Sequence, residues 1–398
     1  MVAGHLQEKS GQFYAVLSYK DHSGKRRSKW ISTGLAVKGN KKKAEALLME
    51  IRRKFVPPEQ DDNDEISADA EISFVRFLDK WIKILKTTVK PATYSSYCQI
   101  LHSPIRPYFI EKGLSLVGLQ ASDIQEFYLK QLERVSSNTV IHYHAIIHKA
   151  LKYAVKTGLI PVNPADKVDR PKKNSFTPSF YDREEINLLF KAVEGTELEL
   201  PVKLAAFYGL RRSECIGLRW NAIDFENNTI TINHTVTTVE IDGKDVDLAS
   251  DTTKTKSSLR TLPLVPVFKE LLLHKQAEQK EFRRLCGNAY CTDYLDYVCV
   301  NQLGMRTSPN YVTEAFPKFL KKHGLRVIRF HDLRHSCASV LLANGVPMKQ
   351  IQEWMGHSDF STTANIYAHL DYQSKITSAE AMLAGLGLKA TGFNSLET

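Results

Sequence analysis

An acidic stretch headed by two prolines interrupts the chain at residues 57–71. Pro57 and Pro58 precede five carboxylates within seven residues, from Glu59 to Glu65. Proline removes backbone donors and like charges repel, so neither a packed helix nor a strand is expected here. We therefore predict a flexible linker, and a chain of 398 residues that folds as separate domains on either side of it.

The segment before this linker, residues 1–56, is strongly basic. It holds 13 Lys and Arg against 4 Asp and Glu, almost all of the chain's net charge of +10. Aromatic and β-branched residues predict strands at 12–19 and 25–32, and apolar spacing predicts a helix at 41–55. A small sheet with a basic face suits strands that enter a DNA groove, although a merely solvated surface has the same composition. The expected DNA contacts are Arg26, Arg27, Lys29 and Trp30.

Residues 72–170 are predicted to be mostly helical. Apolar side chains recur at helical spacing over residues 74–85, and a second helix is expected at 87–101. A third helix is expected from Asp123 onward, and a fourth from its cap at 137–139 to about Lys156. Several polar side chains on these helices can reach phosphates or bases, or can simply keep the helix surfaces soluble. They are Lys86, Lys90, Thr93, Tyr94, Asn138, Thr139 and His142.

A second linker is expected at residues 171–177, and the rest of the chain, 178–398, is predicted to form one unit. Its alternating segments predict a small antiparallel sheet from strands at 229–232, 235–241 and 259–263. Apolar periodicity predicts helices, with weakly ordered residues at the C-terminal end. The helices are expected at about 266–285, 309–323, 332–343 and 347–355.

Chemistry-bearing side chains gather toward the end of this unit. His331 and Arg334 are three residues apart, which places them on one helix face where both can reach a single oxyanion. His357 and the phenol of Tyr367 follow. A tyrosine near several cationic donors is what attack on a phosphodiester needs. The competing interpretation is that His331 caps a helix and Tyr367 packs in a core.

An upstream segment decides between these interpretations. Phe207-Tyr208-Gly209-Leu210-Arg211-Arg212-Ser213-Glu214 ends an apolar run, and Lys254 lies in Thr-Lys-Thr-Lys-Ser-Ser farther on. The order Arg, Lys, His-x-x-Arg, Gly-His, Tyr resembles the tyrosine recombinase family, most of all the integrases of phages and conjugative transposons. Five pieces in order over about 160 residues make the resemblance specific.

The resemblance implies a mainly α fold with small antiparallel sheets. It implies an arm-type DNA-binding domain at 1–56, a helical core-binding, SAM-like domain at 72–170 and a catalytic domain at 178–398. The implied activity is site-specific DNA recombination for a mobile element, through a 3′-phosphotyrosine and a Holliday junction.

The resemblance also assigns roles to the site residues. Arg211 and Arg334 clamp the phosphate, and His331 balances charge or acts as general acid or base. His357 donates to a non-bridging oxygen, and Tyr367 is the nucleophile. Lys254 is the general acid that protonates the leaving oxygen, with Lys256 a close rival because the hairpin length can slip by two. The carboxylates of Glu214 and Asp332 can orient these cations or be ordinary helix charges.

The expected partners follow from charge and chemistry. A net charge of +10 favours a polyanion, and the resemblance implies double-stranded DNA at core and arm sites. It also implies a monomer when free, a homotetramer on DNA, and a DNA-bending or excision accessory protein. No cofactor or metal is expected, because protein cations and the covalent ester supply what the reaction needs. No run of 18 apolar residues and no C-x-x-C pair is present, which predicts a cytoplasmic protein without a membrane span. The resemblance implies a bacterial protein associated with the nucleoid.

Three rival functions share parts of this pattern. His331 and His335 have the i, i+4 spacing of a zinc hydrolase, but Asp332 stands where that motif has Glu and a third ligand is not evident. A type IB topoisomerase would use the same chemistry without site preference. A catalytically silent DNA-binding regulator would not need the complete set of site residues.

Overall fold

The structure, a computed structural model, divides into two units, residues 1–71 and 72–398. Within the second unit, two large clusters of buried apolar side chains form, one between Phe74 and Val168 and the other between Tyr181 and Leu333. No helix in the described part of the chain is long and apolar enough to cross a membrane. The described residues are 3–9, 11–20, 26–54, 72–174, 179–241, 243–251, 259–356, 382, 383, 385 and 386.

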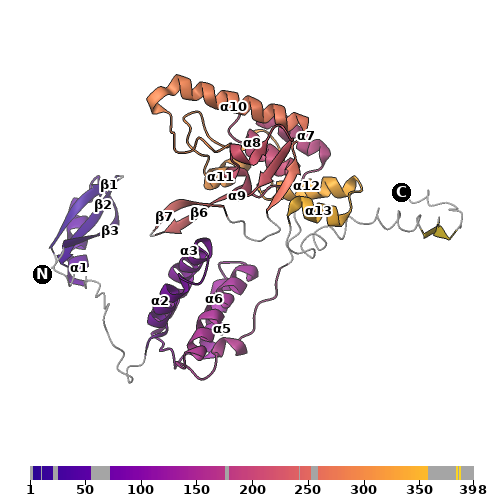
Figure 1. Cartoon of the computed structure of the whole chain (residues 1–398). Helices are drawn as coiled ribbons and strands as arrows, with labels where there is room; N and C mark the ends of the chain where they lie inside the picture. The colour runs from indigo at the N-terminus through magenta and orange to yellow at the C-terminus, as the bar shows by residue number, and fades with distance from the viewer. Residues whose placement is uncertain are drawn as a thin grey trace. The chain divides into compact units, whose positions relative to one another are not determined.

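The N-terminal unit is a three-stranded antiparallel sheet with one helix against it (Figure 1). Ala15 and Leu17 alternate inward from the central strand and pack against Leu48 of the helix. The two predicted strands and the predicted helix are present. The first strand was not predicted, because its sequence is mostly polar and none of its residues is buried. The elements are β1 (Ala3–Lys9), β2 (Gln12–Lys20), β3 (Arg26–Ala36) and α1 (Lys41–Lys54).

Helices build the part of the second unit that carries the Phe74–Val168 core. The predicted stripe is buried along α2, from Phe74 to Leu85. The predicted helix at 87–101 begins later, at Pro91, where proline suits the first helical position. The described helices here are α2 (Phe74–Leu85), α3 (Pro91–Ile100), α4 (Arg106–Lys112), α5 (Ala121–Leu132) and α6 (Ser137–Lys156), with a π-helical turn at Leu101–Ile105 and a 3-10 turn at Pro164–Lys167.

The remaining part combines helices with two small sheets. Its helices are α7 (Arg183–Val193), α8 (Glu199–Tyr208), α9 (Arg212–Gly217), α10 (Pro266–Cys286), α11 (Pro309–Lys322), α12 (Asp332–Ala343) and α13 (Met348–Met355), with 3-10 turns at Trp220–Ala222 and Gly287–Ala289. Its strands are β4 (Ile223–Asp224), β5 (Thr229–Ile232), β6 (Thr235–Ile241), β7 (Lys244–Ser250) and β8 (Arg260–Pro263). The mainly α class with small antiparallel sheets is confirmed.

The strand pairing differs from the single sheet that the sequence predicted. β8 pairs with β5, with Ile230 opposite Leu262, while β6 pairs with β7 as a separate hairpin in which Val239 faces Val246. Strand β7 was not predicted, because its sequence Lys-Asp-Val-Asp-Leu-Ala-Ser is largely polar and it packs against one neighbour only. The hairpin is therefore an insertion between the two strands that hold the core.

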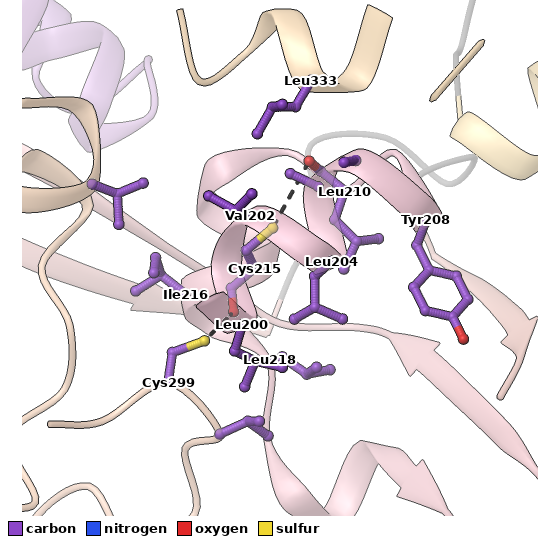
Figure 2. Packing of buried hydrophobic residues seen from close by; sticks show 14 of the residues in the cluster. Leu200, Val202, Leu204, Tyr208, Leu210, Cys215, Ile216, Leu218, Cys299 and Leu333 are labelled. Carbon is purple, nitrogen blue, oxygen red and sulfur yellow. Dashed lines mark hydrogen bonds between the residues drawn. The ribbon is translucent and has the colours of Figure 1, made fainter. Parts of the chain in front are cut away.

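Apolar side chains of α8 and α9 form the centre of the second core (Figure 2). The thiol of Cys215 donates to the carbonyl oxygen of Leu210 at 3.9 Å, and that of Cys299 donates to the carbonyl oxygen of Cys215 at 3.4 Å. Burial raises the pKa of Cys299 to about 12, so this thiol stays protonated and unreactive. The core fixes the short α8–α9 connection, which carries the first site residue.

Candidate active site

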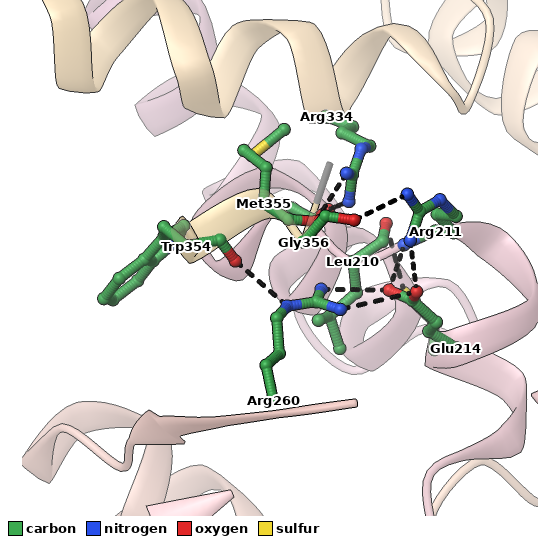
Figure 3. Close-up of polar contacts among 10 residues, drawn as sticks. Leu210, Arg211, Glu214, Arg260, Arg334, Trp354, Met355 and Gly356 are labelled. Carbon is green, nitrogen blue, oxygen red and sulfur yellow. Dashed lines mark hydrogen bonds and ion pairs between the residues drawn. The ribbon is translucent and has the colours of Figure 1, made fainter. Parts of the chain in front are cut away.

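Arg211 stands at the turn between α8 and α9, where the backbone places its side chain above a buried carboxylate (Figure 3). Its backbone N–H donates to Glu214 Oε2 at 3.0 Å and its Nη1 donates to Oε1 at 2.7 Å. The Arg211 side chain stays 33% exposed while that of Glu214 is 2% exposed. The carboxylate therefore holds the guanidinium in place and leaves it open to a ligand.

Arg334 supplies a second guanidinium from the first turns of α12. Its Nη1 donates to the carbonyl oxygen of Gly209, and its Nη2 donates to that of Met355 at 2.5 Å. Burial and the nearby charge of Arg211 lower the pKa of Arg334 to about 9, which still leaves the side chain cationic at neutral pH. Arg334 and Arg211, 123 positions apart in the sequence, therefore bind the carbonyls of two consecutive residues, Met355 and Gly356.

Gly209 is suited to this junction because it ends α8 in the left-handed region, at φ 64°. A Cβ at this position would lie 2.4 Å from Met355 Sδ. The close approach of the α8 end to α13 therefore requires a residue without a side chain.

The end of α13 closes the site from the other side. Gly356 terminates the helix in the left-handed conformation, and its carbonyl oxygen accepts a hydrogen bond of 3.1 Å from Arg211 Nη2. Gly356 directly precedes His357, so the chain enters the predicted Gly-His motif beside the arginine that the sequence assigned to the clamp.

Glu214 is shared between two arginines. Arg260 of β8 donates from Nη2 to Glu214 Oε2 at 3.0 Å and from Nη1 to Oε1 at 3.4 Å. Burial alone would raise the pKa of Glu214, but the charges of Arg260, Arg211 and Arg334 outweigh it, and the net pKa is lowered. The carboxylate is ionised at neutral pH. The sequence analysis proposed Glu214 as an orienting carboxylate but did not single out Arg260.

A pattern in β8 could have identified Arg260. Residues two apart in a strand share a face, and Leu262 faces the core. Arg260 therefore also faces inward, and an inward guanidinium requires a buried acceptor.

His331 lies at the N-terminal end of α12, with its ring centroid 5.2 Å from that of His335. His331 is an exposed residue, but lost hydration and the nearby His335 and Arg334 lower its pKa to about 4. The imidazole is neutral at pH 7 in the free protein and can accept a proton. No group of three potential metal ligands occurs among the described residues, so the His331–His335 pair gains no third ligand there.

Asp332 does not orient either clamp arginine. Its carboxylate pairs instead with Arg329, whose Nη2 donates to Oδ1 at 2.7 Å. Arg329 and His331 border a cavity of about 550 Å³ that Arg211 and Arg212 also line. The lining residues are Arg211, Arg212, Ser213, Thr237, Thr313, Pro317, Arg329, Phe330 and His331.

Four predicted site residues lie outside the described residues: Lys254, Lys256, His357 and Tyr367. The chain on both sides of residues 252–258 is anchored. Asp251 accepts hydrogen bonds from His234 Nδ1 at 2.6 Å and Arg219 Nη1 at 3.1 Å, and Arg260 begins β8 on the far side.

The predicted DNA contacts of the N-terminal unit lie on β3. Arg26 and Lys29 are exposed, the Arg27 side chain is outside the described set, and Trp30 is 45% exposed. Trp30 also contacts its own unit, since Lys9 Nζ lies 5.8 Å from the centre of its ring.

The predicted DNA contacts of the helical part differ in solvent exposure. Lys86, Lys90, Thr93 and His142 are exposed, and Tyr94 and Thr139 are half-buried. The side chain of Asn138 exchanges two hydrogen bonds of 3.1 Å with the backbone of Asn174. Asn138 therefore fixes the start of the second predicted linker.

A helical part, a mixed part and a cavity lined by three guanidinium groups describe a multi-domain protein with a cationic site of the kind that a phosphate oxyanion requires. The Phage integrase family matches residues 179–374, and the SAM-like N-terminal domain of phage integrases matches residues 73–132. This chain belongs to the phage integrase family of tyrosine recombinases, enzymes of site-specific recombination.

Similar proteins carry corresponding names. A tyrosine recombinase XerC-like protein of Caldanaerobacter subterraneus is 29% identical over 321 residues, which cover 76% of this chain and 80% of the relative. The tyrosine recombinase XerC of Pediococcus pentosaceus is 30% identical over 55% of this chain and 67% of its own length. The Tn1549 transposon integrase, solved with a circular intermediate DNA, superposes with a TM-score of 0.63 at 19% identity, over 78% of this chain and 99% of that structure.

Proposed function

We propose that this tyrosine recombinase is the integrase of a mobile element and that Tyr367 is its nucleophile. The observation that carries the proposal is the convergence of Arg211, Arg334 and the Gly356 carbonyl from three distant segments, beside a cavity that Arg211 lines. Each segment contributes a piece of the family motif, and the guanidinium groups of Arg212 and Arg329 also line the cavity. A DNA phosphodiester is the anion that such a site fits.

In the proposed reaction, the phenolic oxygen of Tyr367 attacks the phosphorus of one strand. A bond forms between that oxygen and phosphorus, and the bond from phosphorus to the 5′-oxygen breaks. Lys254, or alternatively Lys256, gives a proton to the leaving 5′-oxygen. A 5′-hydroxyl from another strand then attacks the phosphotyrosine and releases the tyrosine. The ester bond is conserved, so neither a nucleotide nor an external energy source is needed.

Charge stabilisation is assigned to the arginines. The transition state concentrates negative charge on the non-bridging oxygens, which fixed cations stabilise without reorganisation. Arg211 and Arg334 take this role, with His357 as a further donor. His331, neutral in the free protein, can accept the phenolic proton of Tyr367, whose ordinary pKa of about 10 disfavours ionisation at neutral pH.

The same proposal assigns the remaining parts of the chain. Residues 1–56 bind arm sites, 72–170 bind core sites and 178–398 carry the chemistry, with linkers at 57–71 and 171–177. Exchange of both strand pairs between two duplexes requires four active sites, hence a homotetramer on DNA assembled from free monomers. A DNA-bending or excision protein would assist on full element ends in the bacterial cytoplasm, at the nucleoid.

The experiment compares wild type with Tyr367→Phe on a nicked suicide duplex that contains the element end. Wild type should accumulate a covalent protein–DNA adduct on a denaturing gel, and Tyr367→Phe should bind the duplex with unchanged affinity and form none. Adducts that persist in Tyr367→Phe would assign the nucleophile to another residue. Relaxation of supercoiled plasmids without any site would instead support a topoisomerase.

A further inference from the structure

Arg260 joins three elements of the site. Besides its two contacts to Glu214 of α9, its Nε donates to the carbonyl oxygen of Trp354 in α13 at 3.0 Å. Its own position on β8 adds the third element, and its side chain is 7% exposed. One guanidinium therefore connects a strand of the core sheet to both helices that border Arg211 (Figure 3).

These two contacts coincide with the two supports of Arg211. Arg211 is held on one side by Glu214 and on the other by the carbonyl of Gly356. Arg260 contacts Glu214 directly, and it holds α13 at Trp354, two residues before Gly356. Movement of either support would displace the Arg211 guanidinium from the cavity.

The charges give Arg260 a second effect. Glu214 pairs with the guanidinium groups of Arg211 and Arg260, and the charge of Arg334 also acts on it, so the three arginines exceed the one carboxylate by two positive charges. Because the Glu214 carboxylate pairs with Arg260 as well as Arg211, it neutralises only part of the positive charge of Arg211. Arg211 therefore stays available to a phosphate while Arg260, buried below it, has no access to one.

We infer that Arg260 is a positioning residue for strand cleavage, which acts through Glu214 and the end of α13 on Arg211. The inference rests on the proposed function, because it concerns the phosphate that Arg211 holds. Since Arg260 acts through the arginine that neutralises the non-bridging oxygens, its importance should depend on the charge of those oxygens.

The first test measures single-turnover cleavage of the suicide duplex by Arg260→Met and Arg260→Lys, each at a protein concentration that saturates the duplex. Arg260→Met should cleave about 100-fold more slowly than wild type with duplex affinity within about threefold. Arg260→Lys should lose about tenfold, because an ammonium keeps the charge but cannot form the fork to Glu214 and reach Trp354 together. Cleavage by both variants within threefold of wild type would overturn the inference.

The second readout separates positioning from mere stability. In a duplex with a methylphosphonate at the scissile position, a methyl group replaces one non-bridging oxygen and removes the negative charge. The deficit of Arg260→Met in strand cleavage should shrink to within about fivefold on this duplex. An equal deficit on both duplexes, together with a lowered melting temperature, would show a structural role only and overturn the inference.

Arg306→Met is the matched control. Arg306 is also 7% exposed and pairs with a carboxylate, that of Asp247 at 3.1 Å, but it contacts neither Glu214 nor α13 in the contacts described. Its cleavage ratio between the two duplexes should equal that of wild type, and a shift as large as that of Arg260→Met would overturn the inference. If wild type cleaves neither duplex, the proposed function fails. If wild type cleaves but the deficit of Arg260→Met is the same on the charged and the uncharged duplex, only this inference fails.

Discussion

The backbone carbonyl of Gly356 accepts a 3.1 Å hydrogen bond from the guanidinium of Arg211, 145 residues earlier in the chain. This bond places the residue before His357 against the arginine that the sequence assigned to the phosphate clamp. It also makes the end of α13 part of the site, so small changes in backbone position there should change catalysis.

Replacing Glu214 by Gln should affect both stability and cleavage. Gln keeps the size of the side chain but leaves two guanidinium groups facing a neutral amide. Loss of one partner of a buried ion pair costs about 3 kcal/mol, measurable by urea denaturation, and cleavage should fall about 100-fold. The control Glu185→Gln removes a carboxylate that pairs with the more exposed Arg326 and should leave cleavage unchanged. Wild-type cleavage by Glu214→Gln would contradict the role assigned to this carboxylate.

Gly209→Ala should destabilise the protein through two separable effects. Alanine is strained at φ 64°, and its Cβ would meet Met355 Sδ at 2.4 Å, for a combined cost of about 1–3 kcal/mol. Gly345→Ala isolates the strain, because Gly345 has φ 76° and nothing within 4 Å of an added Cβ. Urea denaturation should therefore give a larger loss for Gly209→Ala, with slower cleavage because Arg334 loses its fixed acceptor. Equal losses in both variants would show that the packing against Met355 is unimportant.

The free protein should lose stability as the pH falls from about 6.5 toward 4. His331 has a folded-state pKa of about 4, below the ordinary value of about 6.5, so the unfolded chain binds more protons in this window. The contribution is complete above pH 6.5 and is lost as the pH falls through the folded pKa. His144, whose pKa burial also lowers to about 4, acts in the same direction.

Melting temperatures measured across this window test the assignment. His331→Asn should show a weaker decline than wild type, while His274→Asn, on the exposed surface of α10, should follow wild type. A decline in His331→Asn as steep as that of wild type would exclude His331 as a contributor.

The general acid can be assigned with a sulfur substrate. A duplex with sulfur in place of the scissile 5′-oxygen releases a thiol, which is far more acidic than an alcohol and needs no protonation. Lys254→Ala should cleave the oxygen duplex about 100-fold more slowly than wild type and the sulfur duplex within about fivefold. Lys256→Ala is the matched control, and the reverse pattern would assign the role to Lys256.

The arm-binding role predicts a selective effect of the N-terminal unit. Removing residues 1–55 should leave cleavage of isolated core sites within about threefold but strongly reduce recombination of full element ends. Replacing Arg26, Arg27 and Lys29 with Gln should do the same, whereas replacing Lys41, Lys42 and Lys43, an equal charge on α1, should not. Unchanged recombination of full ends after the deletion would refute the role.

Local patterns predicted much of the helical architecture. The stripe from Phe74 to Leu85 identified α2, because its apolar spacing matches the period of a helix that buries one face. The helix predicted at 309–323 is α11, Pro309–Lys322, which begins with a proline at its first helical position. Strands β1 and β7 were not predicted. An edge strand is held by backbone hydrogen bonds, which polar sequences form as well as apolar ones do.

By itself, the sequence determined the chemical types and the order of the site residues, since Arg211, His331 and Arg334 are recognisable from their motifs. Only the tertiary structure decided what holds them in place. The acceptors are the carbonyls of Gly209, Met355 and Gly356, and a carbonyl is the same group in every residue. Likewise, the pairing of Arg260 with Glu214 joins residues 46 positions apart, a proximity set by how β8 packs against α9 and by no local pattern.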